Sequence, residues 1–484
     1  MTVEWEDITS GQIASAIKGE RISGIRGSVL TGISTDSRQI QPGQIFLALK
    51  GETYDGHDFI ERAVERGASG IIAEKGRGFR VPSKKDIFII EVTDTLRALG
   101  DLANWWRRRH EVVVACITGS AGKTTTKEMT AGILNLGSRT LKNKGNLNNL
   151  IGLPLTLLQL RHKDSRAVLE MGMNRPGEIG RLTEISEPDI GLITNVARAH
   201  LEGVGDIRGV ARAKTELLER ISWEGQVVLH GDDEILMREA SRFQRKTITY
   251  GLGAANDVRA SGIENLGGGG FSFNLQFRGE CHPMKIHVPG DHNLLNALAA
   301  SSIALCMGES YEHISKGLSN FNGIEGRFRP VTLPGDIILV DDTYNSNPLS
   351  LKAALDSIKG MAGNKRRVIL GLGDMMELGD ETESAHLEAG EMVAELGVTY
   401  FLAMGDHASE MLTGALNKGF PPHRTHESAS HQDMAEKIRS VMKKGDLILL
   451  KGSRKVGLEK VSQTLKKIRP KESYNAQIKK NYGG

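Results

Sequence analysis

CITGSAGKTTTKEM, residues 116–129, follows a run of β-branched residues and leads into a segment of helix-forming residues. It contains the Gly-Lys-Thr of a phosphate-binding loop, directly after a predicted strand. The common loop has a glycine five positions before the glycine of Gly-Lys-Ser/Thr, but Ile117 stands at that distance before Gly122. The loop is therefore shorter than the common form, and its ability to bind phosphate has to be argued from its individual residues.

The short loop keeps the groups that bind phosphate. Gly119 and Gly122 permit positive φ and let backbone N–H groups approach an oxyanion closely. The predicted helix adds unpaired N–H groups and a dipole worth about 0.3–1 kcal/mol at an exposed site. Lys123 adds a full positive charge, and the Thr124 hydroxyl can bind Mg²⁺. The segment predicts nucleotide binding; the alternative is a glycine-rich turn that caps a helix. The residues expected around the phosphates are Gly119, Ser120, Ala121, Gly122, Lys123, Thr124 and Thr125.

The composition is typical of a soluble globular protein. Hydrophobic residues make up 39% and charged residues 25% of the 484 residues, too many for one core, so two to four domains are expected. The net charge of +3 gives no reason to expect nucleic acid binding. No run approaches the roughly 20 apolar residues that cross a bilayer, so we expect no integral membrane segment. Three widely spaced cysteines, Cys116, Cys281 and Cys306, fit a reducing cytoplasm.

Strand-like and helical patterns alternate along the chain and predict an α/β fold with three domains, 1–95, 96–329 and 330–484. The first domain has short apolar runs, such as DIFIIEV, between turns. The second contains EVVVACITGS, RAVLEMG, DIGLITNV and GQVVLHGDD, which predict a mostly parallel sheet, and NLGGGGFSFNLQF, which predicts an antiparallel excursion. The third has buried-strand runs in DIILVDDTYNSNP, RRVILGLGDM, VTYFLAMG and DLILLKGSR, which predict a doubly wound sheet.

Two polar residues follow predicted strands of the second domain. Glu170, in LEMGMNRPGEI, stands at a strand end, where ligands of open α/β sheets bind, and a carboxylate there can hold Mg²⁺. His200, in NVARAH, follows another strand. Taken alone, either residue could be purely structural.

Several motifs occur in the order typical of one family. The chain resembles the ATP-dependent Mur ligases of peptidoglycan synthesis in TGSAGKTTTKEM, GNLNNLIGLP, LEMGMNRPGEI, NVARAHLEGVGDIRGVARAKTELL, GDHNLLNALAA, GRF and DDTYNSNP. The resemblance runs from STDSR to KGSR, and the family also uses the shortened phosphate loop. DDTYNSNP, GDMMELG and KGSRKVGLEKV are most similar to the member that adds the terminal dipeptide.

The resemblance implies a bacterial, cytoplasmic and monomeric ligase. It implies joining of D-alanyl-D-alanine to UDP-N-acetylmuramoyl-tripeptide through an acyl phosphate, with ATP converted to ADP and phosphate and with two Mg²⁺ ions. The first domain is then a small UDP-substrate domain and the second a central P-loop-type ATPase domain. The C-terminal domain completes the ATP site and binds the dipeptide.

The resemblance also implies the roles of the catalytic residues. Lys123 stabilises the β- and γ-phosphates, and Arg327 reaches the γ-phosphate from a domain junction. Thr124 and Glu170 hold one Mg²⁺. His200 and a carbamylated Lys214 hold the second, because carbamylation turns a repulsive cation into an anionic oxygen donor.

The remaining implied contacts concern ATP and the other substrates. Asn293 or Asn296 contacts adenine, and Asp342 meets the ribose, although Asp341 could take its place. The UDP pocket is expected at Ser34, Thr35, Asp36, Ser37, Arg38 and Lys50. The sugar-peptide or phosphate is expected near Asn146, Asn148 and Asn149. Asn345 and Asn347 shape the loop beside Asp342, and Lys451, Ser453 and Arg454 are expected to bind the dipeptide carboxylate.

Competing interpretations explain less of the chain. A P-loop kinase accounts only for the phosphate loop, and a nucleotide-switched scaffold leaves Lys123, Glu170, His200 and Lys214 without a purpose. The tripeptide-forming ligase usually carries Asp-Asn-Pro-Arg, which is absent here. Folate polyglutamate synthases share the loop but are disfavoured by DDTYNSNP and the first domain.

Overall fold

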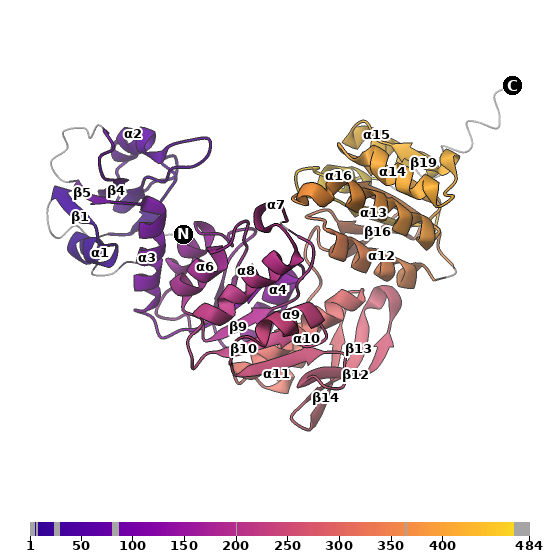
Figure 1. Ribbon diagram of the computed structural model, residues 1–484, viewed down its shortest axis with the longest axis horizontal. Helices are drawn as coiled ribbons and strands as arrows, with labels where there is room; N and C mark the ends of the chain where they lie inside the picture. Colours follow the sequence, from indigo (N-terminus) through magenta and orange to yellow (C-terminus); the bar gives the residue numbers. More distant parts are fainter. Residues whose placement is uncertain are drawn as a thin grey trace.

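The structure is a computed structural model that describes Trp5 and residues 8–23, 30–79, 87–199, 201–363 and 365–468. The described chain forms three α/β units, each built on its own sheet, with the central unit between the other two (Figure 1). This arrangement confirms the predicted fold class. The boundaries 95/96 and 329/330 stay predictions.

The first unit contains a five-stranded sheet in the order β1-β5-β4-β3-β2. Its strands are β1 (Glu20–Ser23), β2 (Gly32–Ser34), β3 (Gln44–Leu47), β4 (Gly70–Glu74) and β5 (Phe88–Val92). Only the β1–β5 pair among them is antiparallel. Its helices are α1 (Ser10–Ala16), the 3-10 turn η1 (Gly56–Phe59), α2 (Ile60–Glu65) and α3 (Thr95–Arg107). The helix α3 leads into the central unit.

The central unit contains a nine-stranded sheet in the order β14-β13-β12-β11-β10-β9-β6-β8-β7 among the described residues. Its strands are β6 (Val113–Thr118), β7 (Thr140–Lys142), β8 (Arg166–Glu170), β9 (Ile190–Ile193), β10 (Gln226–His230), β11 (Thr247–Gly251), β12 (Val258–Asn265), β13 (Phe271–Phe277) and β14 (Glu280–Ile286). The strands from β7 to β12 are parallel, whereas β13 is antiparallel to both of its neighbours, β12 and β14, as predicted for the excursion.

The helices of the central unit cover both faces of this sheet. They are α4 (Lys123–Leu134), α5 (Gly152–Leu157), α6 (Glu178–Ser186), α7 (Leu201–Val204), α8 (Ile207–Arg220), α9 (Glu234–Ala240), η2 (Gly267–Gly269), α10 (Asp291–Cys306) and α11 (Tyr311–Ser319). The strand β6 lies between β9 and β8, and all its residues from Val114 to Thr118 are buried. A β-branched run that is buried on both faces is typical of a central parallel strand.

The C-terminal unit contains a six-stranded sheet in the order β15-β16-β20-β17-β18-β19. Its strands are β15 (Arg329–Leu333), β16 (Ile337–Asp342), β17 (Val368–Gly373), β18 (Tyr400–Met404), β19 (Thr425–Glu427) and β20 (Leu447–Lys451). Its helices are α12 (Pro348–Ala362), η3 (Gly379–Glu381), α13 (Thr382–Leu396), α14 (Ala408–Asn417), η4 (Pro422–Arg424), α15 (His431–Val441) and α16 (Glu459–Lys466). All pairs except β15–β16 are parallel.

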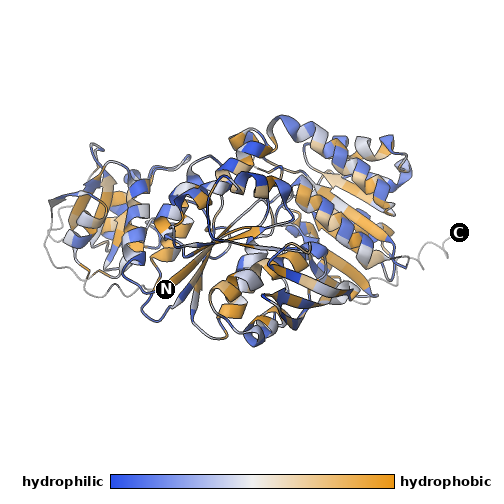
Figure 2. Cartoon of the chain, turned by 60° about the horizontal axis from the view of Figure 1, so that its bottom comes forward, coloured by the Kyte–Doolittle hydropathy of each residue, from blue (hydrophilic) through white to orange (hydrophobic). Residues whose placement is uncertain are grey.

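The two joints between units differ in their packing. One apolar cluster runs from the first unit, through Leu102 and Trp106 of α3, to Leu169 and Leu182 of the central unit. Trp106 stacks on Trp5 with a centroid distance of 5.3 Å. The apolar clusters of the C-terminal unit contain residues of that unit alone, apart from Phe328 at its edge. Figure 2 shows hydrophobic residues concentrated in the strands.

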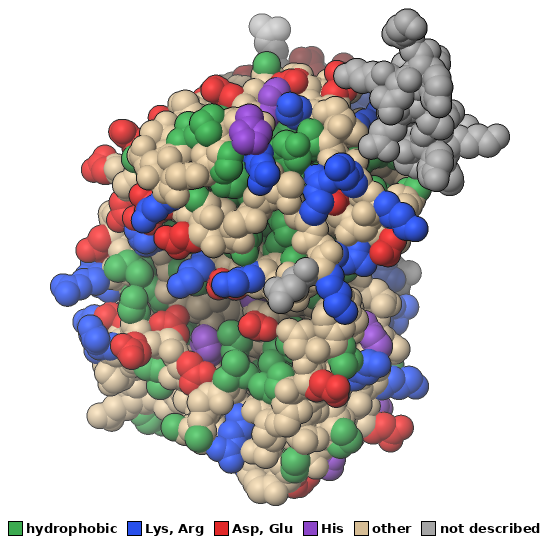
Figure 3. Space-filling model, turned by 90° about the vertical axis from the view of Figure 1, so that its right-hand side faces the viewer, with side chains coloured by type: hydrophobic (Ala, Val, Ile, Leu, Met, Phe, Trp, Pro, Cys, Tyr) green, Lys and Arg blue, Asp and Glu red, His purple; other side chains and the backbone are tan. Residues whose placement is uncertain are grey.

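The face shown in Figure 3 carries lysine and arginine side chains interspersed with aspartate and glutamate, as the small net charge leads one to expect. No described helix combines the length and the apolar character that crossing a bilayer requires.

Candidate active site

A cleft of about 1280 Å³ lies between the central and C-terminal units. The central unit contributes the loop between β6 and α4, the carboxyl ends of β8, β9 and β10, and the start of α10. The C-terminal unit contributes the residues that follow β16, β17 and β20. The carboxyl ends of parallel strands from two sheets therefore face one cavity, which is the usual place for ligands in such folds.

The loop between β6 and α4 requires glycine at two positions. Gly119 has φ of +146°, and a Cβ there would lie 1.8 Å from the Thr194 hydroxyl oxygen. Gly122 has φ of +83°, and a Cβ there would lie 2.4 Å from the Asn296 side-chain oxygen. Any side chain at these positions would displace the loop, so the backbone N–H groups at the start of α4 depend on both glycines.

Two residues after β9 hold this loop and were not predicted. The Thr194 hydroxyl donates to the Ala121 carbonyl at 2.6 Å. The Ala121 N–H donates to the Asn195 side-chain oxygen at 2.9 Å, and the Ser120 hydroxyl donates to the Ala197 carbonyl at 3.1 Å. The position of Thr194 and Asn195 at the end of a predicted strand was the available signal. They fix the loop in place before any nucleotide binds.

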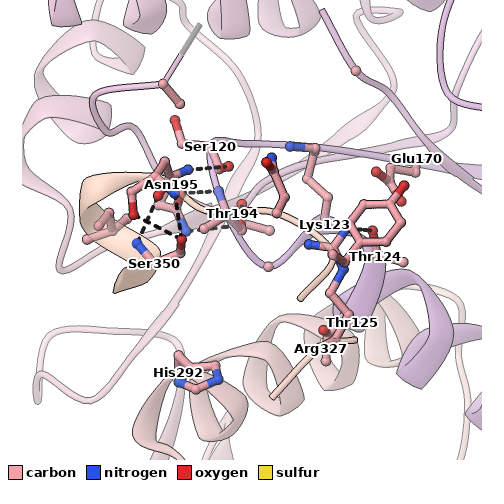
Figure 4. Close-up of a pocket in the computed structure, with 18 of the residues that line it drawn as sticks. Ser120, Lys123, Thr124, Thr125, Glu170, Thr194, Asn195, His292, Arg327 and Ser350 are labelled. Carbon is pink, nitrogen blue, oxygen red and sulfur yellow. Dashed lines mark hydrogen bonds between the residues drawn. The ribbon is translucent and has the colours of Figure 1, made fainter. Parts of the chain in front are cut away.

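Lys123, Thr124 and Arg327 meet at the start of α4 (Figure 4). The Lys123 ammonium donates to the Gly119 carbonyl at 2.7 Å. The Arg327 guanidinium donates to the Thr124 hydroxyl at 3.3 Å and lies 3.8 Å from the centroid of the Tyr344 ring. Burial lowers the pKa of Lys123, and the charge of Arg327 lowers it further, while Glu170 and Glu377 act in the opposite direction. The site thus gathers cations where phosphates are expected.

Glu170 ends β8 and lines the cleft on the same side as Lys123. Its Oε1 accepts a hydrogen bond from the Asn148 amide at 2.8 Å. Its Oε2 is buried and has no hydrogen-bond partner, although the ammonium of Lys127 lies 3.7 Å away. Lys127 itself is fully buried and donates to the Asn143 carbonyl at 2.8 Å. A buried carboxylate oxygen without a partner is costly unless a cation joins it, which suits a metal ligand.

Lys214 lies on α8 and is 1% exposed. It does not line the cleft in this structure. Burial, assisted by the nearby charge of Lys123, lowers the pKa of Lys214 well below its usual value. Burial therefore favours the neutral amine of Lys214 over the ammonium.

The start of α10 forms another part of the cleft wall. The Asn293 amide donates to the Pro289 carbonyl at 2.7 Å, and the Asn296 amide donates to the Asn293 side-chain oxygen at 3.3 Å. Both asparagines line the cleft, and each also stabilises local structure. Their neighbour His292 packs edge-on against Phe328 and was not predicted.

The predicted Asp342 and Lys451 form one unit. They are register partners at the ends of the parallel strands β16 and β20. The Lys451 ammonium donates to Asp342 at 2.7 Å and to the Asn345 carbonyl at 3.0 Å. Lys451 therefore holds Asp342 in place; it also lines the cleft, and its predicted contact with the dipeptide carboxylate stays a prediction. Asp341 accepts from Ser462, Thr343 and Lys466 and does not line the cleft.

The other predicted residues of the C-terminal unit differ in their exposure and in the protein contacts that they already make. The Asn347 side-chain oxygen caps α12 by accepting from the Ser350 N–H at 2.8 Å, and its amide lies 3.5 Å from the Ser120 carbonyl. The Ser453 hydroxyl accepts from the Met376 N–H at 3.0 Å and is buried. Arg454 is exposed, lines the cleft and lies over the Tyr344 ring.

The cleft thus brings together most of the predicted residues. It is lined by Ser120, Ala121, Gly122, Lys123, Thr124, Thr125, Asn146, Asn148, Asn149, Glu170, Asn293, Asn296, Arg327, Asp342, Asn345, Asn347, Lys451, Ser453 and Arg454. His200 lies outside the described residues.

The residues predicted for the UDP pocket lie in the first unit, away from this cleft. Ser34 ends β2, and Arg38 pairs with Asp36 at 2.9 Å across a surface turn. That ion pair holds the pKa of Asp36 at about 2. Ser37 is buried, and Lys50 is exposed. Thr35 belongs to the same turn.

Comparisons with known proteins agree along the chain. Residues 29–107 match the Mur ligase family catalytic domain, residues 117–304 the Mur ligase middle domain, and residues 326–454 the Mur ligase glutamate ligase domain. The UDP-N-acetylmuramoyl-tripeptide–D-alanyl-D-alanine ligase of Escherichia coli K12 is 34% identical over 95% of this chain and 98% of its own length.

Solved structures give the same result. A crystal structure of MurF from Acinetobacter baumannii has a TM-score of 0.86 at 32% identity and covers 96% of this chain and 100% of its own. A structure of MurF ligase from Thermotoga maritima in complex with ADP has a TM-score of 0.80 at 28% identity, covering 90% of this chain and 97% of its own.

Proposed function

The chain belongs to the Mur ligase family, and from this premise we propose that it joins D-alanyl-D-alanine to UDP-N-acetylmuramoyl-tripeptide, converting ATP to ADP and phosphate. The observation that carries the proposal is the single cleft in which a phosphate loop meets Arg327, Asp342 and Arg454. The near-complete coverage of a relative named for this reaction supports the choice within the family.

The chemistry explains why the cleft is rich in cations. A free carboxylate does not react with an amine at a useful rate, because oxide is too poor a leaving group. Transfer of the γ-phosphoryl group of ATP to the tripeptide carboxylate gives an acyl phosphate and ADP. The dipeptide amine then attacks the acyl carbon, and the tetrahedral intermediate expels phosphate. Each step concentrates negative charge, which fixed cations stabilise.

We assign the phosphate contacts to the central unit and to the junction. The N–H groups at the start of α4 and the Lys123 ammonium bind the β- and γ-phosphates. Lys123 now donates to a loop carbonyl and can exchange that bond for a phosphate oxygen. Arg327, steadied by the Tyr344 ring, contacts the γ-phosphate with a planar guanidinium. Asn293 or Asn296 contacts adenine, and Asp342, held by Lys451, contacts the ribose.

Mg²⁺ fits the donor set of the cleft. The Thr124 hydroxyl and the unpartnered oxygen of Glu170 would hold one ion, which neutralises phosphate charge when bound. Phosphate oxygens and water would supply the remaining ligands of this ion. His200 and carbamylated Lys214 would hold a second ion.

The carbamate on Lys214 is supported by the state of its amine. Carbon dioxide adds to a neutral amine, forming an N–C bond and releasing one proton. Burial lowers the pKa of Lys214 and so favours that neutral amine, and burial also shields the product from water. The resulting anion is an oxygen donor.

The remaining substrate contacts follow the three units. We assign the UDP moiety to residues 1–95 at Ser34–Arg38 and Lys50, ATP to 96–329, and the dipeptide to 330–484. Asn146, Asn148 and Asn149 lie on the path of the sugar-peptide, and Arg454 meets the dipeptide carboxylate. We also propose that the chain is a cytoplasmic monomer. Its three unpaired cysteines support the cytoplasm as its compartment.

The test is a coupled phosphate-release assay. We expect phosphate release only when ATP, UDP-N-acetylmuramoyl-tripeptide and D-alanyl-D-alanine are all present. Equal ATP turnover with a free amino acid in place of the dipeptide would overturn the assignment. Parallel assays with tripeptides that differ in the third residue identify the preferred precursor.

A further inference from the structure

A buried asparagine, Asn143, lies behind Glu170 and has no role in the mechanism so far. It follows β7 directly, and β7 pairs with β8, the strand that Glu170 ends. The residue is 0% exposed, so its polar side chain has to find all its hydrogen-bond partners inside the protein. No role was predicted for it from the sequence.

The Asn143 side chain commits both of its N–H donors and its oxygen to two segments of backbone. Its oxygen accepts from the Glu170 N–H at 2.9 Å. Its amide nitrogen donates to the Glu170 carbonyl at 2.9 Å and to the Leu147 carbonyl at 2.8 Å, which uses both donors of a primary amide. One buried side chain thus fixes the end of β8 and the turn that carries Asn148.

The same turn reaches the Glu170 carboxylate itself. The Asn148 amide donates to Oε1 of Glu170 at 2.8 Å, and the Asn148 carbonyl accepts from the Gly172 N–H at 2.8 Å. Asn143 therefore acts on Glu170 in two ways, on its backbone directly and on its carboxylate through the turn. These contacts hold Oε1, whereas Oε2 has no hydrogen-bond partner.

The buried ammonium of Lys127 lies near Glu170 but does not take this free oxygen. It donates to the backbone carbonyl of Asn143 at 2.8 Å and lies 3.7 Å from Oε2 of Glu170, which is too far for a hydrogen bond. The Asn143 carbonyl thus holds the ammonium where its charge attracts the carboxylate while Oε2 stays unpartnered.

The phosphate loop is held by a separate set of contacts. Thr194 and Asn195 bond to Ala121 and follow β9, whereas Asn143 follows β7. Loss of the Asn143 side chain should therefore disturb Glu170 more than it disturbs the backbone N–H groups that bind phosphate. This separation makes the two effects distinguishable by experiment.

We propose that Asn143 is the positioning residue for a divalent-cation site at Glu170, because its buried amide fixes the Glu170 backbone and the turn whose Asn148 aligns the carboxylate. The inference rests on the proposed function, in which Thr124 and Glu170 would hold Mg²⁺. Residues that orient a metal ligand without touching the ion typically contribute about 10–100-fold to metal affinity. The effect of Asn143 should therefore appear in the cation dependence of nucleotide binding.

The test measures how strongly Mg²⁺ strengthens nucleotide binding. Calorimetry gives the dissociation constant of a non-hydrolysable ATP analogue for the full chain, once with EDTA and once with saturating Mg²⁺. The ratio of the two constants is the coupling between cation and nucleotide. We expect tighter binding with Mg²⁺ in the wild type. A merely structural role of Asn143 would lower the Tm of a variant and leave this coupling ratio unchanged.

The variants remove the Asn143 contacts to different extents. Asn143→Leu keeps the approximate size of the side chain and removes its three hydrogen bonds, so we expect the coupling ratio to fall by about tenfold or more. Its dissociation constant with EDTA should stay close to that of the wild type. Asn143→Ser, whose hydroxyl can still donate one hydrogen bond, should lose a smaller part of the ratio and decides the test if Asn143→Leu does not fold.

The matched control is Asn135→Leu. Asn135 is exposed at the end of α4, and its side chain bonds to the Ala131 carbonyl and the Thr140 N–H. The same substitution there also removes hydrogen bonds from an asparagine to the backbone, but it should leave the coupling ratio at the wild-type value.

Three results would overturn the inference. They are a wild-type coupling ratio in the Asn143 variant that folds, a loss of coupling that Asn135→Leu shares, and a wild-type chain that binds the analogue equally well with and without Mg²⁺. The proposed function fails on a different result: a chain that shows the full Asn143 effect but releases no phosphate when ATP, UDP-N-acetylmuramoyl-tripeptide and D-alanyl-D-alanine are supplied.

Discussion

The central and C-terminal units are both helix-covered sheets of mostly parallel strands, yet they bring different kinds of group to the cleft. The central unit presents backbone N–H groups on a loop that Gly119 and Gly122 make possible. The C-terminal unit presents side chains, such as Asp342, that distant strands pair and hold. The backbone site consists of a few consecutive residues, which Thr194 and Asn195 hold in place. A side-chain site exists only once the sheet has formed.

The largest expected effect comes from disrupting the backbone phosphate site of the central unit. Gly119→Ala puts a Cβ against the Thr194 hydroxyl at a φ that alanine avoids, and so displaces several phosphate donors together. We expect phosphate release to fall by more than about 10³-fold, since one preorganised donor alone is worth about 10²–10³-fold. Gly360→Ala, where an added Cβ meets nothing within 4 Å, is the control and should retain activity. Retained activity in Gly119→Ala would show that the loop is more plastic than its geometry indicates.

In the C-terminal unit, breaking the Asp342–Lys451 pair should act mainly by lowering the free energy of unfolding. Lys451→Met leaves the buried Asp342 carboxylate with the Phe328 N–H but without its cationic partner, and removing one member of such a pair typically costs about 3–5 kcal/mol. We expect denaturant unfolding to report a loss on that scale, together with a raised KM for ATP. Lys451→Met with Asp342→Asn removes both charges and should recover part of the stability. Equal destabilisation in the single and double variants would contradict the pairing.

A smaller loss of phosphate release is expected from a third variant, which tests whether activity also depends on a buried side chain of the central unit. Lys214→Ala should lower phosphate release by about 10²-fold, the scale of one electrostatic contribution, and added short-chain carboxylic acids should restore part of it. Lys352→Ala, on the exposed face of α12, is the matched control. Undiminished activity in Lys214→Ala would remove the carbamate from the mechanism.

The smallest expected effect is on thermal stability, and it concerns His292, at the contact between the central and C-terminal units. Burial lowers the pKa of His292 to about 4, against an ordinary value near 6.5. Between these values the unfolded chain binds more protons than the folded chain, so the free energy of unfolding falls as pH drops from 6.5 to 4 and is flat above 6.5. We expect the Tm of the wild type to fall by a few degrees more than that of His292→Asn over this range, on the order set by about 1 kcal/mol. Parallel Tm curves would contradict a His292 imidazole that stays neutral in the folded chain.

The comparison also explains how much of the fold the sequence predicts. The strands β6, β8, β9 and β10 and the strands β16, β17, β18 and β20 were predicted and are confirmed, because each contains a continuous run of apolar residues. The strands β7, β15 and β19 were missed; they are short or half-exposed and lie at sheet edges. The strand β11 was also missed, since its first three residues are not buried.

The residues of the site likewise divide into those that the sequence predicts and those that it does not. Residues 119–125 could be predicted because two glycines and Gly-Lys-Thr directly after a strand are the groups that bind phosphate, although their spacing departs from the common loop. The supports Thr194 and Asn195 could not, because nothing in the local pattern shows which distant backbone group each side chain meets. Lys451 was predicted as a ligand contact, but its partner Asp342 is visible only in the register of β16 and β20.

The two joints between the units differ in the kind of contact that holds them together. The first unit shares an apolar cluster with the central unit, so separating them exposes hydrophobic surface. The C-terminal unit meets the central unit partly through Arg198, whose partners Glu381 and Glu388 lie 3.3 Å away on half-exposed or exposed side chains. Such pairs are worth about 0–1 kcal/mol each and weaken in salt. We therefore expect these contacts at the joint to the C-terminal unit to weaken as ionic strength rises, whereas the apolar joint to the first unit should respond much less.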